Sequence, residues 1–266
     1  MAAKHAVSPL APKTTPTLPR IAGVKLAAAQ SGVRYKDRDD VMLAVVPAGA
    51  TVAGVLTRSK TSSAPVDWCR KNLARGKVRA IIVNAGNANA FTGKAGDKAV
   101  EESTRSVAQA LGCPRNEVFM ASTGVIGQPL DWEKIAAVVP ALIKSAREDG
   151  WSSAAAAIMT TDTFPKLATR QAKIGERTVT INGFLKGSGM IAPDMATMLC
   201  FVFTDAKVPG AVLQKLVADA ADKSLNCVTV DGDTSTSDTL LMVATGAARH
   251  APIEEADDPV LVDFKR

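Results

Sequence analysis

The sequence predicts a mixed α/β fold, and three observations lead to that prediction. Short apolar runs rich in β-branched residues alternate with helix-like segments, but without the regular rhythm of repeated βαβ units. Hydrophobic residues make up 47% of the 266 positions and aromatic residues only 4%, so the core must rest mainly on Ala, Val, Leu and Ile. A chain of this length can form one large domain or two modest ones, and it contains no internal repeat.

The first third of the chain is predicted to be an arm followed by strands around one helix. Residues 1–20 are rich in proline and form an extended arm. The apolar runs 41–46 and 51–57 are predicted strands, because a Pro-Ala-Gly turn separates them. A helix is predicted over 64–73, and residues 78–83 form a strongly apolar strand that leads into an asparagine-rich loop.

The middle of the chain contains the longest predicted helices. Residues 96–111 have helical composition and are followed by a glycine that ends the helix. A strand is predicted over 117–121. Asp131 is a candidate N-cap for a helix that runs to about residue 147 and is kinked at a proline. Small residues fill 152–159, and this segment is assigned to neither class.

The last third is predicted to contain one hairpin and one strand–helix–strand unit. The dipeptide Asn182-Gly183 predicts a hairpin turn after a strand at 178–181. The three elements that follow are a strand, an amphipathic helix and a second strand, at 198–203, 210–223 and 240–244.

Charge and composition disfavour several classes of protein. The net charge of +6 comes from scattered Lys and Arg, with no run of five or more, so a basic solvated surface is favoured over a nucleic-acid site. The first twenty residues lack the apolar stretch of a secretory signal, and no segment approaches the roughly 20 apolar residues of a membrane span. The cysteines lie far apart without a Cys-x-x-Cys pair, which favours free thiols in a reducing compartment. We therefore expect a cytoplasmic protein that binds neither membrane nor nucleic acid.

Histidine is nearly absent, which limits the chemistry open to the protein. The two histidines are His5 and His250, close to the two ends, so a Ser-His-Asp triad or a histidine metal site is disfavoured. The aspartates of 231–238 do not form a calcium loop, because Thr236 and Met242 stand where that loop requires Gly and Glu. We expect no metal, and chemistry carried by hydroxyls, amines, amides and carboxylates.

The stretch 186–199 carries the strongest functional signal in the chain. A glycine-rich loop and a Pro-Asp turn precede Thr197, which opens an apolar strand-like run. Cleavage of the Ala196–Thr197 bond would give Thr197 a free α-amine, whose pKa of about 7.7–8 suits a base for its own hydroxyl. A plain loop before a strand is the alternative. A dinucleotide fingerprint over 187–192 is rejected, because Pro193 and a strand follow where that fingerprint needs a helix.

Five ordered motifs resemble those of the ArgJ family, the ornithine acetyltransferases of arginine biosynthesis. The resemblance runs from about Ser8 to the C-terminus. It is carried by an asparagine-rich loop, an oxyanion-hole segment, a threonine-rich turn, the cleavage-site stretch and an acidic loop, at 84–93, 121–127, 160–166, 186–199 and 231–238.

This resemblance implies a fold and an activity. The fold would be of the α/β (α+β) class, with stacked β-sheets covered by helices, of the N-terminal-nucleophile type found in DmpA and ArgJ proteins. The activity would be transfer of acetyl from N2-acetylornithine to glutamate, without a resident cofactor. Some family members also use acetyl-CoA as a co-substrate, and the sequence does not decide between one activity and both.

The resemblance also implies roles for individual residues. Thr197 would be the nucleophile and would divide the chain into an α part, 1–196, and a β part, 197–266, which assemble as a heterotetramer. Thr123 and Gly124 would form the oxyanion hole. Lys186, taken as a residue of the glycine-rich loop, and Thr163 would bind substrate together with Thr197. The non-catalytic alternatives are a tight turn for Thr123 and Gly124, a solvated loop lysine for Lys186 and a turn residue for Thr163.

Family members continue beyond Arg266, so the resemblance implies that this chain is truncated at its C-terminus. Three other functions stay open. They are an N-terminal-nucleophile hydrolase or aminopeptidase of similar fold, an inactive fragment, and a related acetyltransferase of secondary metabolism.

Overall fold

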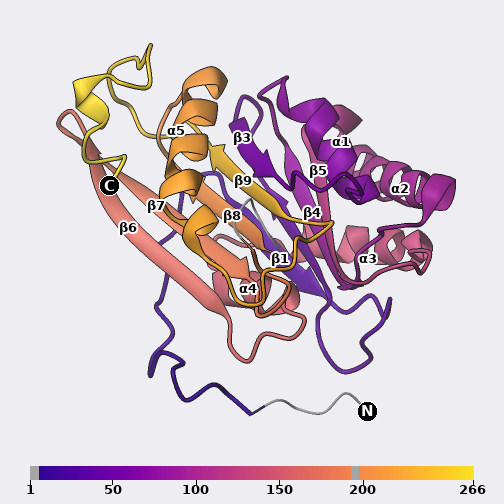
Figure 1. Ribbon diagram of the computed structural model, residues 1–266. Coiled ribbons are helices and arrows are strands. Elements are labelled where there is room, and N and C mark those ends of the chain that lie inside the picture. Colours follow the sequence, from indigo (N-terminus) through magenta and orange to yellow (C-terminus); the bar gives the residue numbers. More distant parts are fainter. Residues whose placement is uncertain (1–5, 193–197) are drawn as a thin grey trace.

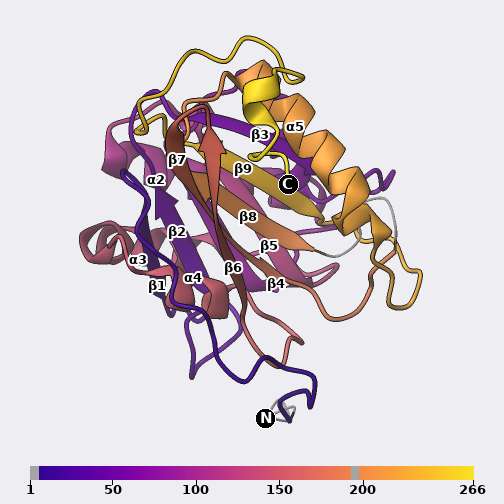
Figure 2. The same ribbon diagram turned by 90° about the vertical axis from the view of Figure 1, so that its left-hand side faces the viewer.

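The computed structural model describes residues 6–192 and 198–266 (Figure 1). It contains two β-sheets stacked face to face, and helices cover the outer face of each. Both views place α5 (Gly210–Lys223) on one side of the sheets and α2 (Gly93–Leu111) with α3 (Trp132–Ser145) on the other (Figure 2). The predicted α/β class and the expected stacked sheets covered by helices are therefore confirmed.

The four-stranded sheet has the order β1-β2-β4-β5. Its strands are Lys25–Ala29, Val41–Val45, Ala80–Asn87 and Val118–Val125. The pairs β1–β2 and β2–β4 are antiparallel, whereas β4 and β5 run parallel. Because β4 and β5 are parallel, their carboxyl ends lie at the same edge of the sheet, and they bring the asparagine-rich loop beside the Thr123-Gly124 segment.

The five-stranded sheet has the order β3-β9-β8-β7-β6. Its strands in that order are Thr51–Leu56, Thr239–Ala244, Leu199–Thr204, Arg177–Lys186 and Lys166–Ile174. Only β8 and β9 are parallel, and the other neighbours are antiparallel. The parallel pair places the starts of β8 and β9 side by side.

The remaining helices close the ends of the sandwich. Helix α1 (Ala64–Leu73) contacts β5 and β3, one strand from each sheet, and α4 (Trp151–Ala157) contacts β1, β2, β6 and β7. Short 3-10 turns lie at Arg115–Glu117, Leu225–Cys227 and Pro259–Leu261. Within residues 6–192 and 198–266, no helix has both the length and the apolar character that a membrane crossing requires.

The central core lies between the two sheets. One face of each strand supplies aliphatic side chains, and Phe184, Phe201 and Phe203 add aromatic rings from β7 and β8. Trp151 of α4 packs edge-on against two of these rings, with centroid distances of 6.4 Å to Phe184 and 5.7 Å to Phe203. Four of the eleven aromatic residues of the chain thus meet where α4 contacts both sheets.

Two outer cores complete the four layers. Helix α5 and the C-terminal segment pack on the outer face of the five-stranded sheet, through residues such as Leu213, Val217 and Leu261. Helices α2 and α3 pack on the outer face of the four-stranded sheet, through residues such as Val107 and Val139. The alternation of inward and outward side chains along each strand explains how the same strands serve both an inner and an outer core.

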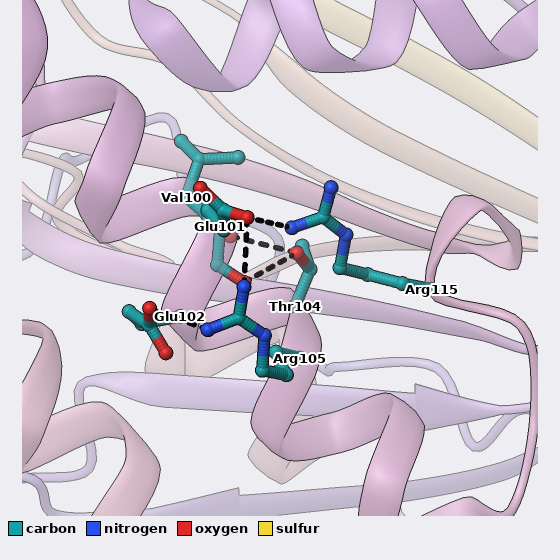
Figure 3. Close-up of polar contacts among 6 residues, drawn as sticks. All are labelled: Val100, Glu101, Glu102, Thr104, Arg105 and Arg115. Carbon is teal, nitrogen blue, oxygen red and sulfur yellow. Dashed lines mark hydrogen bonds and ion pairs between the residues drawn. The ribbon is translucent and has the colours of Figure 1, made fainter.

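An ion-pair network fixes α2 to the segment that enters β5 (Figure 3). Glu101 accepts hydrogen bonds from Arg105 and Arg115, each at 2.7 Å, and Arg105 also contacts Glu102 at 2.6 Å. The Arg115 guanidinium lies 4.9 Å from the centroid of the Trp68 ring on α1. Arg115, in the 3-10 turn before β5, therefore links α1 and α2 near the start of β5, at the opposite end of the strand from Thr123 and Gly124.

The predicted hairpin turn at Asn182-Gly183 is wrong. Both residues lie inside β7, which pairs with β6 without interruption, and the turn falls at Gly175, whose φ is +59°. The buried Asn182 amide donates to Pro19 O at 2.7 Å, and its oxygen accepts from the Thr169 hydroxyl at 2.7 Å. Long-range partners thus satisfy the asparagine within a strand, and they override the local turn preference.

Other element predictions are confirmed, with shifts at their ends. The predicted helix 64–73 coincides with α1, and the predicted strands at 41–46, 51–57, 198–203 and 240–244 correspond to β2, β3, β8 and β9. The strands β4 and β5 extend further than predicted, into the asparagine-rich loop and through Gly124. The strands β1 and β6 were not predicted, and the unassigned segment 152–159 contains α4.

Candidate active site

The candidate site lies where four strand ends of the five-stranded sheet meet. The starts of β8 and β9 are paired at Leu199 and Thr239. The end of β7 is paired with the same position of β8, through Lys186 and Leu199, and the end of β3 with β9, through Leu56 and Thr239. Side chains that flank these ends therefore gather at one edge.

The predicted nucleophile Thr197 and the predicted cleavage partner Ala196 lie outside the described residues. The first described residue after them is Met198, which is buried. Its amide N–H donates to Oδ1 of Asp238 at 2.7 Å, and its carbonyl accepts from the Thr239 amide at 3.0 Å. The residue that follows Thr197 is thus held from both sides by the loop that leads into β9.

Lys186 is a buried strand residue, which corrects its predicted place on the glycine-rich loop. It is the last residue of β7, and only 3% of its surface is exposed. Its Nζ lies 3.5 Å from the hydroxyl oxygen of Thr160. Desolvation lowers the pKa of Lys186 to about 8, against the opposing attraction of Asp162 and Asp238. A lysine buried in this way is not the solvated loop lysine that the sequence offered as the alternative.

Asp162 links the end of β7 to the segment before β6. Its Oδ1 accepts a hydrogen bond from the Gly187 amide at 2.8 Å and forms an ion pair with Lys166. Burial alone would raise the pKa of this carboxyl, but Lys166, the Gly187 amide and Lys186 outweigh it and hold the pKa below its ordinary value. Asp162 is therefore an ionised partner for two lysines.

Asp238 is the second acid of the site, and its environment differs. The side chain is fully buried, and Oδ2 has no hydrogen-bond partner among the residues the structure describes. Burial raises the pKa of Asp238 to about 8, although the Met198 amide, the Ser235 hydroxyl and the Lys186 ammonium oppose that rise. The site thus contains one acid that stays ionised and one that holds a proton to near neutral pH.

The Thr123-Gly124 segment forms the end of β5 beside Gly86 of β4. Gly124 has a φ of +134°, and a Cβ at that position would lie 2.6 Å from the Asn87 amide nitrogen and nearer still to the Gly86 backbone. Only a glycine fits such a backbone and such a contact. Thr123 is buried, and its hydroxyl makes no hydrogen bond to another described residue. A hydroxyl and a close-approach glycine at a strand end are compatible with an oxyanion site.

The asparagine-rich loop is held by its own side chains. Asn84 donates to Asn87 O at 2.9 Å and accepts from the Ser122 hydroxyl at 2.6 Å. The Asn87 side chain accepts from the Asn89 amide at 2.7 Å, and Asn89 donates to Gly96 O at 3.0 Å. Asn87 and Asn89 therefore organise this loop through their side chains.

Backbone hydrogen bonds bring the motifs of the two sheets to the same edge. The Ala64 amide donates to Asn89 O at 3.3 Å, and the neighbouring Ser63 amide donates to Thr236 O at 2.8 Å. The Thr57 amide donates to Asp238 O at 3.0 Å. The asparagine-rich loop, the end of β3 and the loop before β9 are therefore joined through the start of α1.

The structure does not bring Thr163 to this cluster in the way the sequence suggested. The Thr163 hydroxyl accepts a hydrogen bond from the Ser8 amide of the N-terminal arm, at 3.2 Å. The threonine that contacts Lys186 is Thr160. Sequence reasoning missed Thr160 as a contact of Lys186, treated Asp162 as a turn residue and weighed Asp238 only for calcium. All three residues lie in the motifs that resemble the ArgJ family, and that position was the signal that could have identified them.

Asp231 caps the glycine-rich loop and does not belong to an arrangement suited to a metal. Its carboxylate accepts from the Met190 amide at 2.5 Å and from the Ile191 amide at 2.8 Å. Within the described ranges, no group of three or more His, Cys, Asp or Glu is placed to hold a metal ion. An apolar cavity of about 500 Å³ lies under α5, but none of the residues of the candidate site line it.

Comparison with known proteins gives a consistent result. The sequence profile of the ArgJ family matches residues 25–265. The "arginine biosynthesis bifunctional protein ArgJ" of Bradyrhizobium diazoefficiens is 58% identical over 261 residues, which cover 97% of this chain and 63% of the relative. The chain thus spans under two thirds of the length of that curated relative.

Two solved structures share the fold. Ornithine acetyltransferase from Mycobacterium tuberculosis, solved with ornithine, matches with a TM-score of 0.58 and 31% identity, over 67% of this chain and 94% of that chain. An L-aminopeptidase D-Ala-esterase/amidase from Ochrobactrum anthropi, described as a variant of the Ntn hydrolase fold, matches with a TM-score of 0.55 and 15% identity, over 96% of this chain and 84% of that chain. The second likeness is one of fold alone.

Proposed function

The chain belongs to the ArgJ family, and from this premise we propose that it moves acetyl from N2-acetylornithine to glutamate through an acetyl-threonine on Thr197. The proposed products are ornithine and N-acetylglutamate, in arginine biosynthesis. The site residues of this proposal are Thr197 as nucleophile, Thr123 and Gly124 as oxyanion donors, and Lys186 as a substrate-binding group. The reaction uses no metal or bound cofactor, and acetyl-CoA would act only as an additional acetyl donor.

The first step is self-cleavage at the Ala196–Thr197 bond. The Thr197 hydroxyl attacks the Ala196 carbonyl carbon, the C–N bond breaks, and the nitrogen takes up the hydroxyl proton as an ester forms. Water then hydrolyses the ester to give a carboxylate on Ala196 and a free α-amine on Thr197. The α and β parts, 1–196 and 197–266 in this chain, stay together and assemble as a heterotetramer.

The free α-amine then serves as base for the hydroxyl of the same residue. The hydroxyl attacks the acetyl carbonyl of N2-acetylornithine, and ornithine leaves after its nitrogen receives the proton. The glutamate amine next attacks the acetyl-threonine ester and regenerates the hydroxyl. Both tetrahedral intermediates carry an oxyanion, and removal of one donor from such a hole typically costs about 10²–10³ in rate.

The main observation in support of this proposal is the position of the start of β8 beside buried charged side chains. Met198, which follows Thr197, is fixed at the edge where the buried Lys186 and the buried Asp238 meet. A buried lysine is costly unless an anion accompanies it; Asp162 supplies one such anion, and the carboxylate of an amino-acid substrate would supply another. The lengths of the matched proteins add support, because the solved ornithine acetyltransferase chain is shorter than this one whereas the curated relative is longer. Division of a longer polypeptide would produce that pattern.

The experiment that tests the proposal is intact mass measurement under denaturing conditions. The parent chain should give two fragments that divide between Ala196 and Thr197, and Thr197→Ala should give one uncut chain. Thr197→Ser, which keeps a hydroxyl, is the matched control and should still be cut. A parent chain that remains whole, or a Thr197→Ala variant that is cut, would refute the proposed nucleophile.

Product analysis then separates acetyl transfer from hydrolysis. With N2-acetylornithine and glutamate together, N-acetylglutamate should appear in step with ornithine. Acetate as the main product, at a rate that does not depend on glutamate, would identify a hydrolase of the same fold. No turnover by a correctly cleaved chain would identify an inactive fragment.

A further inference from the structure

We propose that Asp162 is the positioning residue for Lys186 in the candidate site, a role that rests on the proposed use of Lys186 to bind the substrate carboxylate. The Asp162 carboxylate fixes the backbone at the end of β7 and keeps the buried ammonium charged. The contacts of Asp162, the hydrogen bonds of Lys186 and the charges around both residues support this role.

Asp162 joins three parts of the chain at one point. Its Oδ1 accepts a hydrogen bond from the Gly187 amide at 2.8 Å and forms an ion pair with Lys166, the first residue of β6. Its Oδ2 accepts from the Thr160 amide at 3.4 Å. Because Gly187 directly follows Lys186, the first of these bonds fixes the backbone from which the Lys186 side chain extends.

The ammonium of Lys186 has hydrogen-bond donors to spare. A lysine ammonium carries three N–H donors. Within residues 6–192 and 198–266, the one hydrogen bond that Nζ makes is to the Thr160 hydroxyl, at a distance of 3.5 Å that is long for such a bond. Asp162 attracts the ammonium electrostatically, but the structure, which describes both residues, contains no direct ion pair between them. A substrate carboxylate can therefore accept from Nζ while Asp162 keeps its own partners.

Asp162 is the acid that carries a negative charge beside Lys186 at neutral pH. Burial lowers the pKa of Lys186 to about 8. Asp162 and Asp238 oppose that decrease, and Lys166 adds to it. Burial raises the pKa of Asp238 to about 8, so that acid is largely protonated at neutral pH. Burial favours a higher pKa for Asp162 as well, but its cationic and amide partners outweigh burial and hold the pKa below its ordinary value.

Asp162→Asn should make Lys186 lose its proton at a lower pH. The variant removes the anion but keeps an oxygen that can accept from the Gly187 amide, so the backbone anchor remains. An opposite charge at short range shifts a pKa by about 1–3 units, so the midpoint for Lys186 should fall by about 1 unit or more. Since kcat/KM reports groups of the free enzyme, its alkaline limb for N2-acetylornithine should move to lower pH by the same amount. Above both midpoints that shift is a loss of about tenfold, expressed mainly as a higher KM.

Lys166→Gln should act in the opposite direction. It removes a cation that disfavours the charged form of Lys186 and leaves the Asp162 carboxylate in place. The alkaline limb should therefore move to higher pH. Loosened packing would disturb both variants in the same sense, so opposite shifts would identify an electrostatic effect.

The test measures kcat/KM for N2-acetylornithine from about pH 6 to about pH 9.5 in the parent and in Asp162→Asn, Lys166→Gln and Asp205→Asn. The α-amine of this substrate is acetylated and an alkyl amine titrates near about 10.4, so the limb in this range belongs to the protein. Asp205→Asn is the matched control. Asp205 accepts from the Thr180 amide at 2.8 Å, at the end of the β7–β8 pair that lies opposite Lys186, so its loss should leave the limb unchanged.

The protonation of Lys186 is also measured without turnover, by NMR. Protein isotope-labelled at the ε-carbon of lysine gives a resonance for each lysine, and the resonance absent from Lys186→Met identifies the buried one. Its titration midpoint should lie near pH 8 in the parent, below the parent value in Asp162→Asn and above it in Lys166→Gln. Intact mass records whether each protein is cut, and urea denaturation whether it is folded.

The outcomes separate this inference from the function beneath it. A parent that does not turn over N2-acetylornithine defeats the proposed function, and the NMR midpoints then decide the role of Asp162 alone. Equal midpoints in the parent and Asp162→Asn overturn that role. Opposite shifts in Asp162→Asn and Lys166→Gln, with Asp205→Asn unchanged, support it. Shifted midpoints with an unmoved limb of kcat/KM overturn the use of Lys186 for the substrate carboxylate, and the proposal with it.

Should Asp162→Asn fail to fold, Lys166→Gln decides alone, because the Lys166 side chain is partly exposed and its replacement leaves the Asp162 anchor intact. A midpoint raised above that of the parent would then support the proposal, and an unchanged or lowered midpoint would overturn it.

Discussion

At the scale of single residues, the contact between Gly124 and Gly86 decides whether β4 and β5 can end side by side. Gly124 combines a φ of +134° with a backbone neighbour that leaves no room for a Cβ. Gly127, three residues later, also has a positive φ of +82°, but nothing lies within 4 Å of where its Cβ would be. Substitution of the two glycines therefore distinguishes backbone strain, which affects both positions, from steric overlap, which affects Gly124 alone.

Gly124→Ala should destabilise the protein more than Gly127→Ala. Overpacking costs about 1–3 kcal/mol and an unfavourable backbone conformation a similar amount, so the first variant carries both penalties and the second only one. Urea denaturation measures the two free energies of unfolding. Equal decreases in the free energy of unfolding of the two variants would mean that β4 and β5 move apart easily at this point. The close contact between Gly124 and Gly86 would then contribute nothing measurable to stability.

At the scale of elements, α4 matters because it is short yet contacts both sheets. Trp151 is its anchor, packed against Phe184 and Phe203 with 2% of its surface exposed. Its indole N–H has no hydrogen-bond partner among the residues the structure describes. Shape complementarity, not polar bonding, therefore holds this helix in place.

Trp151→Ala should cost about 3–5 kcal/mol, the range for removal of a large buried aromatic side chain. Trp151→Phe should cost clearly less, because it keeps a ring and removes an unsatisfied donor whose burial costs roughly 1–3 kcal/mol. Both losses are measured from urea midpoints. A Phe variant as unstable as the Ala variant would indicate that the indole N–H is essential, contrary to its lack of a partner.

The same scale shows how far the sequence predicts the fold. The helix over 64–73 and the strand over 240–244 follow from local periodicity, and the structure has them almost at the predicted bounds. The hairpin at Asn182-Gly183 failed because its deciding contacts, to Thr169 and Pro19, are made by other parts of the chain. Local rules contain no information about such partners.

The candidate site shows a similar division. The motifs located Thr123, Gly124 and Lys186, and the structure shows where each of these lies. Asp238 could not be singled out, because its burial and its contact with Met198 depend on the pairing of β8 with β9. A residue whose burial and contacts depend on strand pairing can be recognised only when that pairing is known.

At the scale of the whole molecule, the buried acid links stability to pH. The pKa of Asp238 is raised from 3.8 to about 8, so between these values the folded protein holds a proton that the unfolded chain releases. The free energy of unfolding falls with rising pH where the folded state binds more protons. The contribution of this carboxyl is therefore greatest in acid and is lost as the pH approaches 8.

Asp238→Asn should remove that dependence. The difference in unfolding free energy between the Asp238 protein and its Asn variant should decrease steadily from about pH 4 to about pH 8, because asparagine does not titrate. Both proteins should carry Thr197→Ala, so that each unfolds as a single chain. A difference that stays constant over this range would mean that Asp238 titrates normally in the fold.

The order of the five-stranded sheet has a consequence for a divided chain. β8 and β9 lie between β3 and β7, so a cut between residues 196 and 197 leaves two strands of the later piece enclosed by strands of the earlier one. Neither piece then contains the complete five-stranded sheet, and the later piece contributes the two inner strands of that wall of the central core. The pieces would behave as a split protein whose halves fold only on each other. Loss of the covalent link would not loosen the molecule, since separation of the two pieces requires both the β3–β9 and the β7–β8 pairings to be broken.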